Sequence, residues 1–207
     1  MAKLATIEKL RTALAKDSYG DLNMVLNAAL EVVTPAIEGV LLTTFTRFQD
    51  RIASYSLANA DVGPGGMITL HLPQAFLVHG SLQVKVASSF SLMSEAVPVD
   101  SSLFLVDGTR GYVTLFPEAL TYGPNGGWVK VTGTYGFNVS ADALGHAYQS
   151  VPSWLEQSAL QAAMEVYDVI RQTNDTEIPR KDLKLPAISM QSLAMYRRTK
   201  QPVVYPV

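Results

Sequence analysis

The stretch GGWVKVTGTYGF, residues 126–137, marks the point where the chain changes from strand to helix. Its residues from Trp128 to Val131 alternate as in an extended strand with two different faces. The next apolar segment, SVPSWLEQSALQAAMEVYDVI at 150–170, has the spacing of a helix instead. The sequence therefore predicts a last β-strand that returns the chain to a long helix.

The helix predicted at 152–172 has a marked beginning and a wide apolar surface. Pro152 suits a first helical turn, and Ser153 with Glu156 could form a capping box. One apolar stripe contains Leu155, Ala159, Ala162, Ala163, Val166, Val169 and Ile170. A second flank carries Leu160, Met164 and Tyr167, and leaves Gln157, Gln161, Glu165, Asp168 and Gln172 for water. This second flank packs either inside the chain or against another subunit, and the sequence does not separate the two.

Two more helices are predicted before residue 43. Residues 6–16 have apolar side chains at helical spacing behind Thr6, a good N-cap residue. A longer apolar face then runs from Asp21, a second candidate cap, to about Leu42, with Pro35 as an internal kink.

Between residues 43 and 140 the apolar period changes to two, which predicts an antiparallel β region. The clearest segments are MITLHL, GSLQVKVASS, SLFLVDGTRGYVTLF and the GWVKVTGTYGF stretch. Asp107 and Gly108 separate two apolar runs, as in a hairpin. The clusters GPGG at 63–66 and GPNGG at 123–127 are interpreted as turns, because neither is followed by the Lys-Ser or Lys-Thr of a phosphate loop.

Composition limits the class of protein. The chain has 207 residues, of which 48% are apolar, so it can bury a core and a disordered chain is not expected. It contains no cysteine, which excludes disulfides and cysteine-ligated zinc. The N-terminal residues mix charges into every turn, and polar residues interrupt the apolar stretch 25–42, so we expect neither a signal peptide nor a membrane anchor.

Charge is unevenly distributed along the chain. Residues 173–207 carry six basic and three acidic side chains, whereas residues 1–172 carry ten basic and fifteen acidic ones. A general DNA-binding protein usually has a basic body, because lysine and arginine contact phosphates. The acidic body therefore argues against tight binding of nucleic acid.

The residues that usually carry chemistry form no recognisable site. His71, His79 and His146 lack the spacing of metal ligands, and no nucleophile elbow, dinucleotide fingerprint or paired catalytic carboxylates is present. We therefore expect no enzymatic activity, no catalytic residues, no bound metal and no cofactor.

The C-terminal segment 173–207 is rich in proline yet carries many apolar residues. Its four prolines favour extended chain, and the stretch ISMQSLAMYRR at 188–198 could form a short helix. Such an apolar tail is expected to dock on its own body, on a neighbouring copy or on another protein, although a disordered end is the alternative.

This order of elements resembles the head-tail connector, or adaptor, proteins of tailed bacteriophages. The resemblance rests on two N-terminal helices, on ITLHLPQAF, SLFLVDGTRGYVTLF and GWVKVTGTYGF in the β region, and on the Val-Pro start of an Ala-rich helix. It covers roughly residues 4–172. The chain departs from the family in its long spacer NVSADALGHAYQS, residues 138–150, and in its sizeable β region.

The resemblance implies an α+β fold: a small helical bundle of two N-terminal helices and one long C-terminal helix, with an inserted antiparallel β region. Residues 1–172 would form one adaptor-like domain, with helices at about 4–42 and 152–172 and the β region at about 43–140. Residues 173–207 would form an extended docking tail.

The resemblance also implies partners and a location. The protein would form a ring, commonly of twelve subunits, beneath the portal protein in the virion neck, after assembly in the host cytoplasm. Its neighbours would be the portal and a stopper or tail-side neck protein, with DNA passing through the channel without sequence-specific binding and no role for a membrane. Leu160, Met164 and Tyr167 would meet the next subunit, and Tyr196, Arg197, Arg198, Lys200 and Tyr205 would dock on the portal or a neighbour.

Two other functions stay open from the sequence. A tail-terminator or head-completion (stopper) ring protein would share the virion context but bind a different neighbour. A β-rich binding module is more distant, and would need an exposed aromatic groove using residues such as Trp128, Tyr135 or Phe137. We expect these three aromatic residues to pack in the core or across strands.

Overall fold

The computed structural model describes residues 2–15, 20–58, 60, 62–122, 126–173, 190 and 193–197. It is a mixed α+β structure with antiparallel sheets, so the α+β class predicted from the sequence is confirmed. The chain divides into two compact units. The helical unit contains residues 1–42 and 137–197, and the sandwich unit contains residues 43–136. That residues 1–172 act as one domain stays a prediction.

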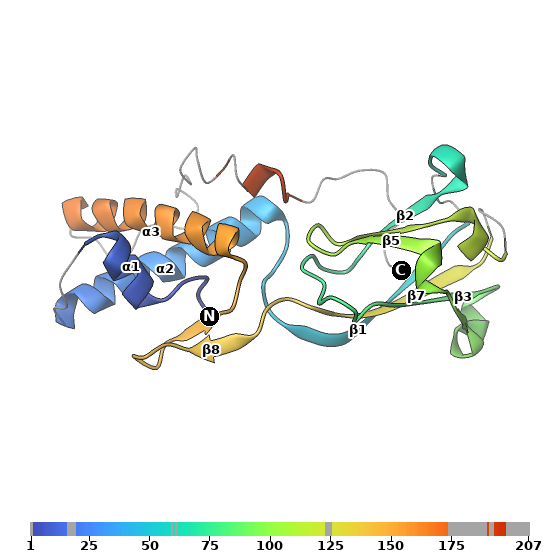
Figure 1. Cartoon of the computed structure of the whole chain (residues 1–207), viewed down its shortest axis with the longest axis horizontal. Coiled ribbons are helices and arrows are strands. Elements are labelled where there is room, and N and C mark those ends of the chain that lie inside the picture. Colours follow the sequence, from blue (N-terminus) through green and yellow to red (C-terminus); the bar gives the residue numbers. More distant parts are fainter. Residues whose placement is uncertain are drawn as a thin grey trace. The chain divides into compact units, whose positions relative to one another are not determined.

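Among the described residues, the helical unit is built around α1 (Ile7–Ala13), α2 (Gly20–Leu41) and α3 (Ser153–Thr173) (Figure 1). Each of these helices contacts the other two. Their shared core is mainly apolar, and its apolar residues are Ile7, Leu10, Leu26, Ala29, Leu30, Val33, Ile37, Leu41, Leu155, Ala159, Ala162, Ala163, Val166 and Ile170. Thr34 and Ser158 are also buried, and their hydroxyls donate to the carbonyls of Leu30 and Trp154 in their own helices. The predicted helical faces are therefore largely those that pack, except that Val169 is 45% exposed.

The helix ends follow local chemistry. Thr6 caps α1 as predicted, because its hydroxyl accepts a hydrogen bond from the Lys9 amide at 3.3 Å. The prediction of Asp21 as a cap is wrong, since α2 already begins at Gly20. Glu156 in the first turn of α3 forms an ion pair with Lys9, at 2.6 Å, and so links α3 to α1.

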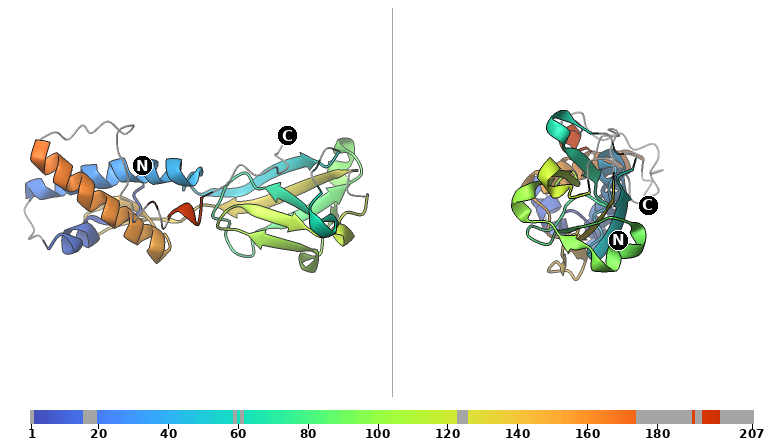
Figure 2. Two further views of the ribbon diagram at one scale, coloured as in Figure 1. Left: turned by 90° about the horizontal axis from the view of Figure 1, so that it is seen from above. Right: turned by 90° about the vertical axis from the view of Figure 1, so that its right-hand side faces the viewer.

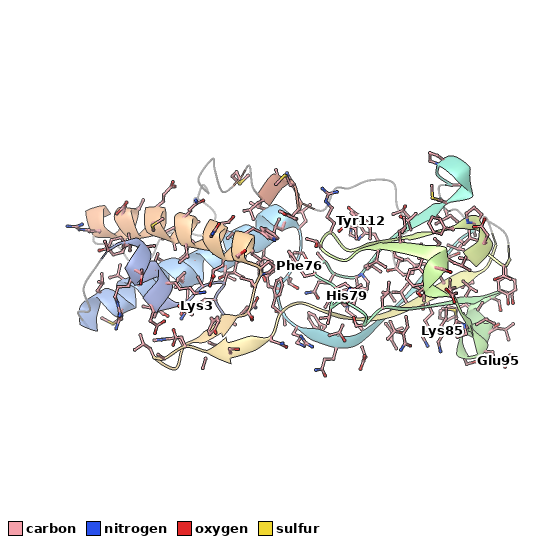
Figure 3. The ribbon with its side chains drawn as sticks, viewed as in Figure 1. Lys3, Phe76, His79, Lys85, Glu95 and Tyr112 are labelled. Carbon is pink, nitrogen blue, oxygen red and sulfur yellow. The ribbon has the colours of Figure 1, made fainter. Side chains whose placement is uncertain are left out.

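The spacer at 138–150 is a β-hairpin rather than an irregular connection. Its strands are β8 (Val139–Ala141) and β9 (Ala147–Gln149), and Asp142 closes the turn by accepting the Leu144 and His146 amides. Lys3 (Figure 3) adds a parallel bridge to β9, while its ammonium group bonds the Asn27 side chain of α2. The β8–β9 hairpin is thereby attached to the helical core.

The sandwich unit consists of two antiparallel sheets (Figure 2). One has the order β1-β7-β3-β4 and the other the order β2-β6-β5. The strands are β1 (Phe48–Ser56), β2 (Ile68–His71), β3 (Gln83–Ala87), β4 (Val97–Pro98), β5 (Phe104–Asp107), β6 (Tyr112–Leu115) and β7 (Trp128–Tyr135). Short 3₁₀ turns connect them, namely η1 (Pro64–Gly66), η2 (Phe90–Glu95), η3 (Ser101–Leu103) and η4 (Pro117–Ala119).

The two sheets share one core because their strands alternate. The inward residues are Ala53 and Tyr55 of β1, Val84 and Val86 of β3, Val129 and Val131 of β7, Ile68 and Leu70 of β2, and Val113 and Leu115 of β6. The predicted β5–β6 hairpin is confirmed, and its turn is closed by Asp107, whose carboxylate accepts the Arg110 amide. Gly111 in that turn has φ +76 and abuts the Gln74 carbonyl, so no other residue would fit there without strain.

The sequence did not single out β1, although it lies in the predicted β region. Its first half is exposed and contains a bulge between Phe48 and Arg51, which interrupts the period of two. Asp50 takes φ +47 in this bulge, a conformation that aspartate tolerates. β1 nonetheless pairs with β7 along almost its whole length.

The first and last segments of the sandwich unit meet at Gly136. The amide of Gly136 donates to the Phe76 carbonyl, and its φ is +79. A Cβ atom at this position would lie 2.4 Å from the Thr46 carbonyl oxygen. Gln74 secures the same first segment, since its side-chain nitrogen donates to the Thr44 and Thr46 carbonyls at 2.6 and 2.9 Å.

Helix α2 is also long and apolar enough, between Leu22 and Leu41, to cross a membrane by length and composition alone. A core helix passes the same test. Here Leu26, Leu30 and Ile37 are buried, and α2 packs against α1 and α3. The packing favours the role of a core helix.

We predict that Gly136→Ala destabilises the sandwich unit by at least about 3 kcal/mol, because alanine is strained at positive φ and its Cβ would strike the backbone of residues 45 and 46. Gly80→Ala is the matched control, since Gly80 has φ +74 but no atom within 4 Å of the added Cβ. It should lose only about 1 kcal/mol. Urea unfolding measures both, and equal losses would refute the steric account.

Candidate functional site

The C-terminal segment 193–197 packs on the beginning of α3. The Tyr196 ring stacks on the Trp154 ring with centroids 3.9 Å apart and planes 12° from parallel. Leu193 is completely buried, and its carbonyl accepts the Tyr196 amide at 3.0 Å. Part of the predicted docking tail is thus held on the helical unit.

This arrangement divides the predicted docking residues. Tyr196 faces Trp154 and is half-buried, whereas Arg197 is exposed. Met195 between them is 61% exposed. Arg198, Lys200 and Tyr205 lie outside the described residues. The segment therefore attaches through Leu193 and Tyr196 and presents Met195 and Arg197 outward.

The spacing of these residues in the sequence is a signal that can predict this division. Leu193 and Tyr196 are three residues apart, so one helical turn places them on one side and the intervening Met195 on another. Trp154 gave no such signal. Its neighbour is more than 40 residues later in the chain, and no local pattern predicts that contact.

The second flank of α3 is only partly available to a neighbour. Tyr167 is 6% exposed, so its side chain is almost entirely covered within the chain. Leu160 and Met164 are half-buried and keep some open surface. Val169, which the sequence predicts in the first apolar stripe of this helix, is exposed and adds apolar surface near the end of α3.

The histidines and acidic groups show no metal-binding arrangement within the part of the chain that the structure describes. His71 contacts Tyr112 edge-on at 5.2 Å, and His146 lies 3.6 Å from Asp142 in the β8–β9 turn. His79 lies in a turn. These histidines come from separate parts of the chain.

One carboxylate has a perturbed pKa. The backbone amide of Ser102 and then its hydroxyl donate to Asp100, and these bonds lower the pKa of that carboxyl. Asp100 caps η3 and is exposed. The hydrogen bonds of this turn cap account for the lowered pKa.

The aromatic residues of the opening stretch have structural positions. Tyr135 is fully buried in the sandwich core. Trp128 is half-buried and packs against Phe90 with centroids 4.9 Å apart. This packing agrees with the expectation of core and cross-strand contacts for these two residues.

The sequence matches no protein-family model and has no significant match among curated proteins.

We predict that Trp154→Ala releases the segment 193–197 while the three helices stay folded. Aromatic stacking contributes about 0.5–1.5 kcal/mol beyond the buried area. Amide hydrogen exchange of Tyr196 and Arg197 should therefore accelerate about tenfold, with exchange in α2 unchanged.

Tyr196→Phe is the matched control for that experiment, because it keeps the ring and removes only the hydroxyl. It should exchange as the native chain does. Unchanged protection of Tyr196 in Trp154→Ala would mean that the stack does not hold the segment.

Proposed function

We propose that this protein is a structural component of the neck of a tailed bacteriophage, where it forms a ring beneath the portal. The ring would join the DNA-filled head to the tail and continue the DNA channel. This is a role in assembly, with no catalytic chemistry. The protein would be located in the virion after assembly in the host cytoplasm.

The observation that carries the proposal is the joining of helices from two distant parts of the chain. α1 and α2 precede residue 43, α3 follows residue 152, and all three contact one another. This supports the finer arrangement of a small helical bundle with an inserted antiparallel β region. It is the same layout on which the resemblance to adaptor proteins rests.

A ring requires two different faces of each subunit to meet. Leu160 and Met164 supply a partly open apolar strip on α3, and exposed Val169 extends it. Tyr167 would support this strip from within the subunit, because its side chain is already buried. We propose this strip as one side of the subunit contact.

The C-terminal tail would dock on the portal, as the family resemblance suggests. Its exposed residues Met195 and Arg197 are of types that carry binding energy at interfaces. Leu193 and Tyr196 would hold residues 193–196 of the tail on the subunit. Arg198, Lys200 and Tyr205 follow directly in the sequence and are proposed as further anchors.

The charge distribution supports a channel that does not retain DNA. Residues 1–172 carry more acidic than basic side chains, and only the C-terminal segment is basic. An acidic wall repels phosphates and leaves DNA mobile, whereas a strongly basic wall would bind it. The DNA would therefore pass without sequence-specific contacts.

A tail-terminator or head-completion (stopper) ring protein is the second candidate function. The same apolar strip on α3 would serve its ring contact, but its neighbour would not be the portal. Binding to isolated portal protein of the same virus separates the two functions. A β-rich binding module is less supported, because Tyr135 is buried and Trp128 packs against Phe90.

We predict that deletion of residues 173–207 lowers the affinity for isolated portal at least about tenfold, through loss of the tail anchors. Surface-immobilised portal and native or truncated protein would give the two dissociation constants. The double variant M195A/R197A tests the same claim with the tail in place, since both residues are exposed. Undiminished affinity of the truncated protein would refute a role of the tail in docking.

We also predict that L160E/M164E prevents ring formation on the portal, because each carboxylate would be buried in an apolar contact. Gln157→Glu adds a carboxylate to an exposed position of the same helix and should leave the ring intact. Mass measurement of portal complexes distinguishes these outcomes, and thermal unfolding checks that both variants fold. Full rings from L160E/M164E would exclude this strip from the subunit contact.

A further inference from the structure

We propose that the outward face of the four-stranded sheet, at Lys85 and Lys130, contacts the phosphate backbone of duplex DNA. The register pairs Lys85 of β3 directly with Lys130 of β7. Their strand neighbours Val84, Val86, Val129 and Val131 are buried in the sandwich core. Because side chains alternate along a strand, both lysines lie on the opposite, outward face.

This face carries positive charge without acidic neighbours in its central rows. The other outward positions, set by the same register, are Ile52, Ser54 and Ser56 of β1, Gln83 and Ala87 of β3, and Trp128 and Thr132 of β7. None of them is a carboxylate. Lys85 and Lys130 are also the only lysines in residues 43–136. The two lysines are therefore concentrated in one row of the sheet.

The pair is not neutralised within the described residues. Neither lysine forms an ion pair there, although η2, which packs against β3, carries Glu95 (Figure 3). Like charges directly opposite each other on a sheet are unfavourable. An anion bound between the two ammonium groups would remove this repulsion, which is the physical reason to expect a partner.

The neighbouring side chains fit phosphate oxygens. Ser54 lies opposite Lys130 on β1, and Thr132 is two residues along β7 on the same face. Lysine and hydroxyl groups are common donors to the DNA backbone, and such contacts read no sequence. The nearest aromatic ring, Trp128, packs against Phe90, so stacking on the bases of a single strand is not required.

This inference rests on the proposed function for the choice of duplex DNA as the polyanion. Two lysines in each subunit would give a weak, salt-sensitive contact that a ring repeats around the channel. Such a contact is compatible with an acidic protein through which DNA stays mobile. It would guide the duplex without retaining it.

The test is the salt dependence of binding between the full chain and a fluorescent DNA duplex. Each phosphate contact contributes about 0.9 to the slope of log affinity against log salt. K85Q/K130Q should therefore reduce the magnitude of the slope by about 2, and weaken binding at about 50 mM salt by at least about tenfold. Native stability in urea should be kept, because both side chains are on the outward face.

The matched control is R171Q/R197Q, which removes the same charge from exposed positions of the helical unit. It should retain more affinity and slope than K85Q/K130Q. Equal effects of the two double variants, or no duplex binding by the native chain at low salt, would overturn the proposal. Preferred binding to a single strand, or to vesicles of anionic lipid, would also overturn it.

Portal binding by K85Q/K130Q separates this proposal from the proposed function. We expect the variant to bind isolated portal as the native chain does, since its tail and α3 are unchanged. If K85Q/K130Q binds DNA as the native chain does, and portal binding is intact, only the DNA contact is refuted. If the lysines are needed for DNA binding but the native chain does not bind portal, the neck adaptor function is refuted instead.

Discussion

The pairing of β1 with β7 is the constraint on which the rest of the structure depends. These strands are the first and the last of the sandwich unit, and they run antiparallel from Phe48 opposite Tyr135 to Ser56 opposite Trp128. The chain therefore enters and leaves the sandwich unit at neighbouring points. A β region between residues 43 and 136 can then separate α2 from α3 in sequence without separating them in space.

Gly136 makes this return possible at the atomic scale. Its positive φ and its close approach to the Thr46 carbonyl leave no room for a side chain. The side chain of Gln74 holds the segment that precedes β1, by donating two hydrogen bonds to the Thr44 and Thr46 carbonyls. Buried backbone groups need such partners, so hydrogen bonds as well as packing hold this segment next to Gly136. Beyond it, the β8–β9 hairpin and Lys3 attach the returning chain to the helical core.

The parts of the fold that could be predicted are those with a long, regular pattern. The period of two predicted β7 and the β5–β6 hairpin, and the helical period predicted the buried faces of α2 and α3. β1 was not singled out because its bulge breaks the alternation, and β8–β9 because short strands with small residues resemble a polar loop. Asp21 was mistaken for a cap because aspartate is also common in the first turn of a helix.

Interaction surfaces were harder to predict than the fold. Tyr196 has a residue type suited to docking, yet its ring is stacked on Trp154, and this long-range contact leaves no local trace in the sequence. The Lys85–Lys130 pair depends on the register of β3 against β7, which the sequence does not define. Each surface arises from residues that are distant in the chain.

The most direct test of a neck adaptor is cryo-electron microscopy of the purified protein mixed with the portal of the same virus. The account predicts a symmetric ring stacked on the portal, with α3 at the contacts between subunits and the C-terminal tails reaching the portal. Folded protein and intact portal that remain separate would contradict it, and would favour a ring protein at another position or a function outside the neck.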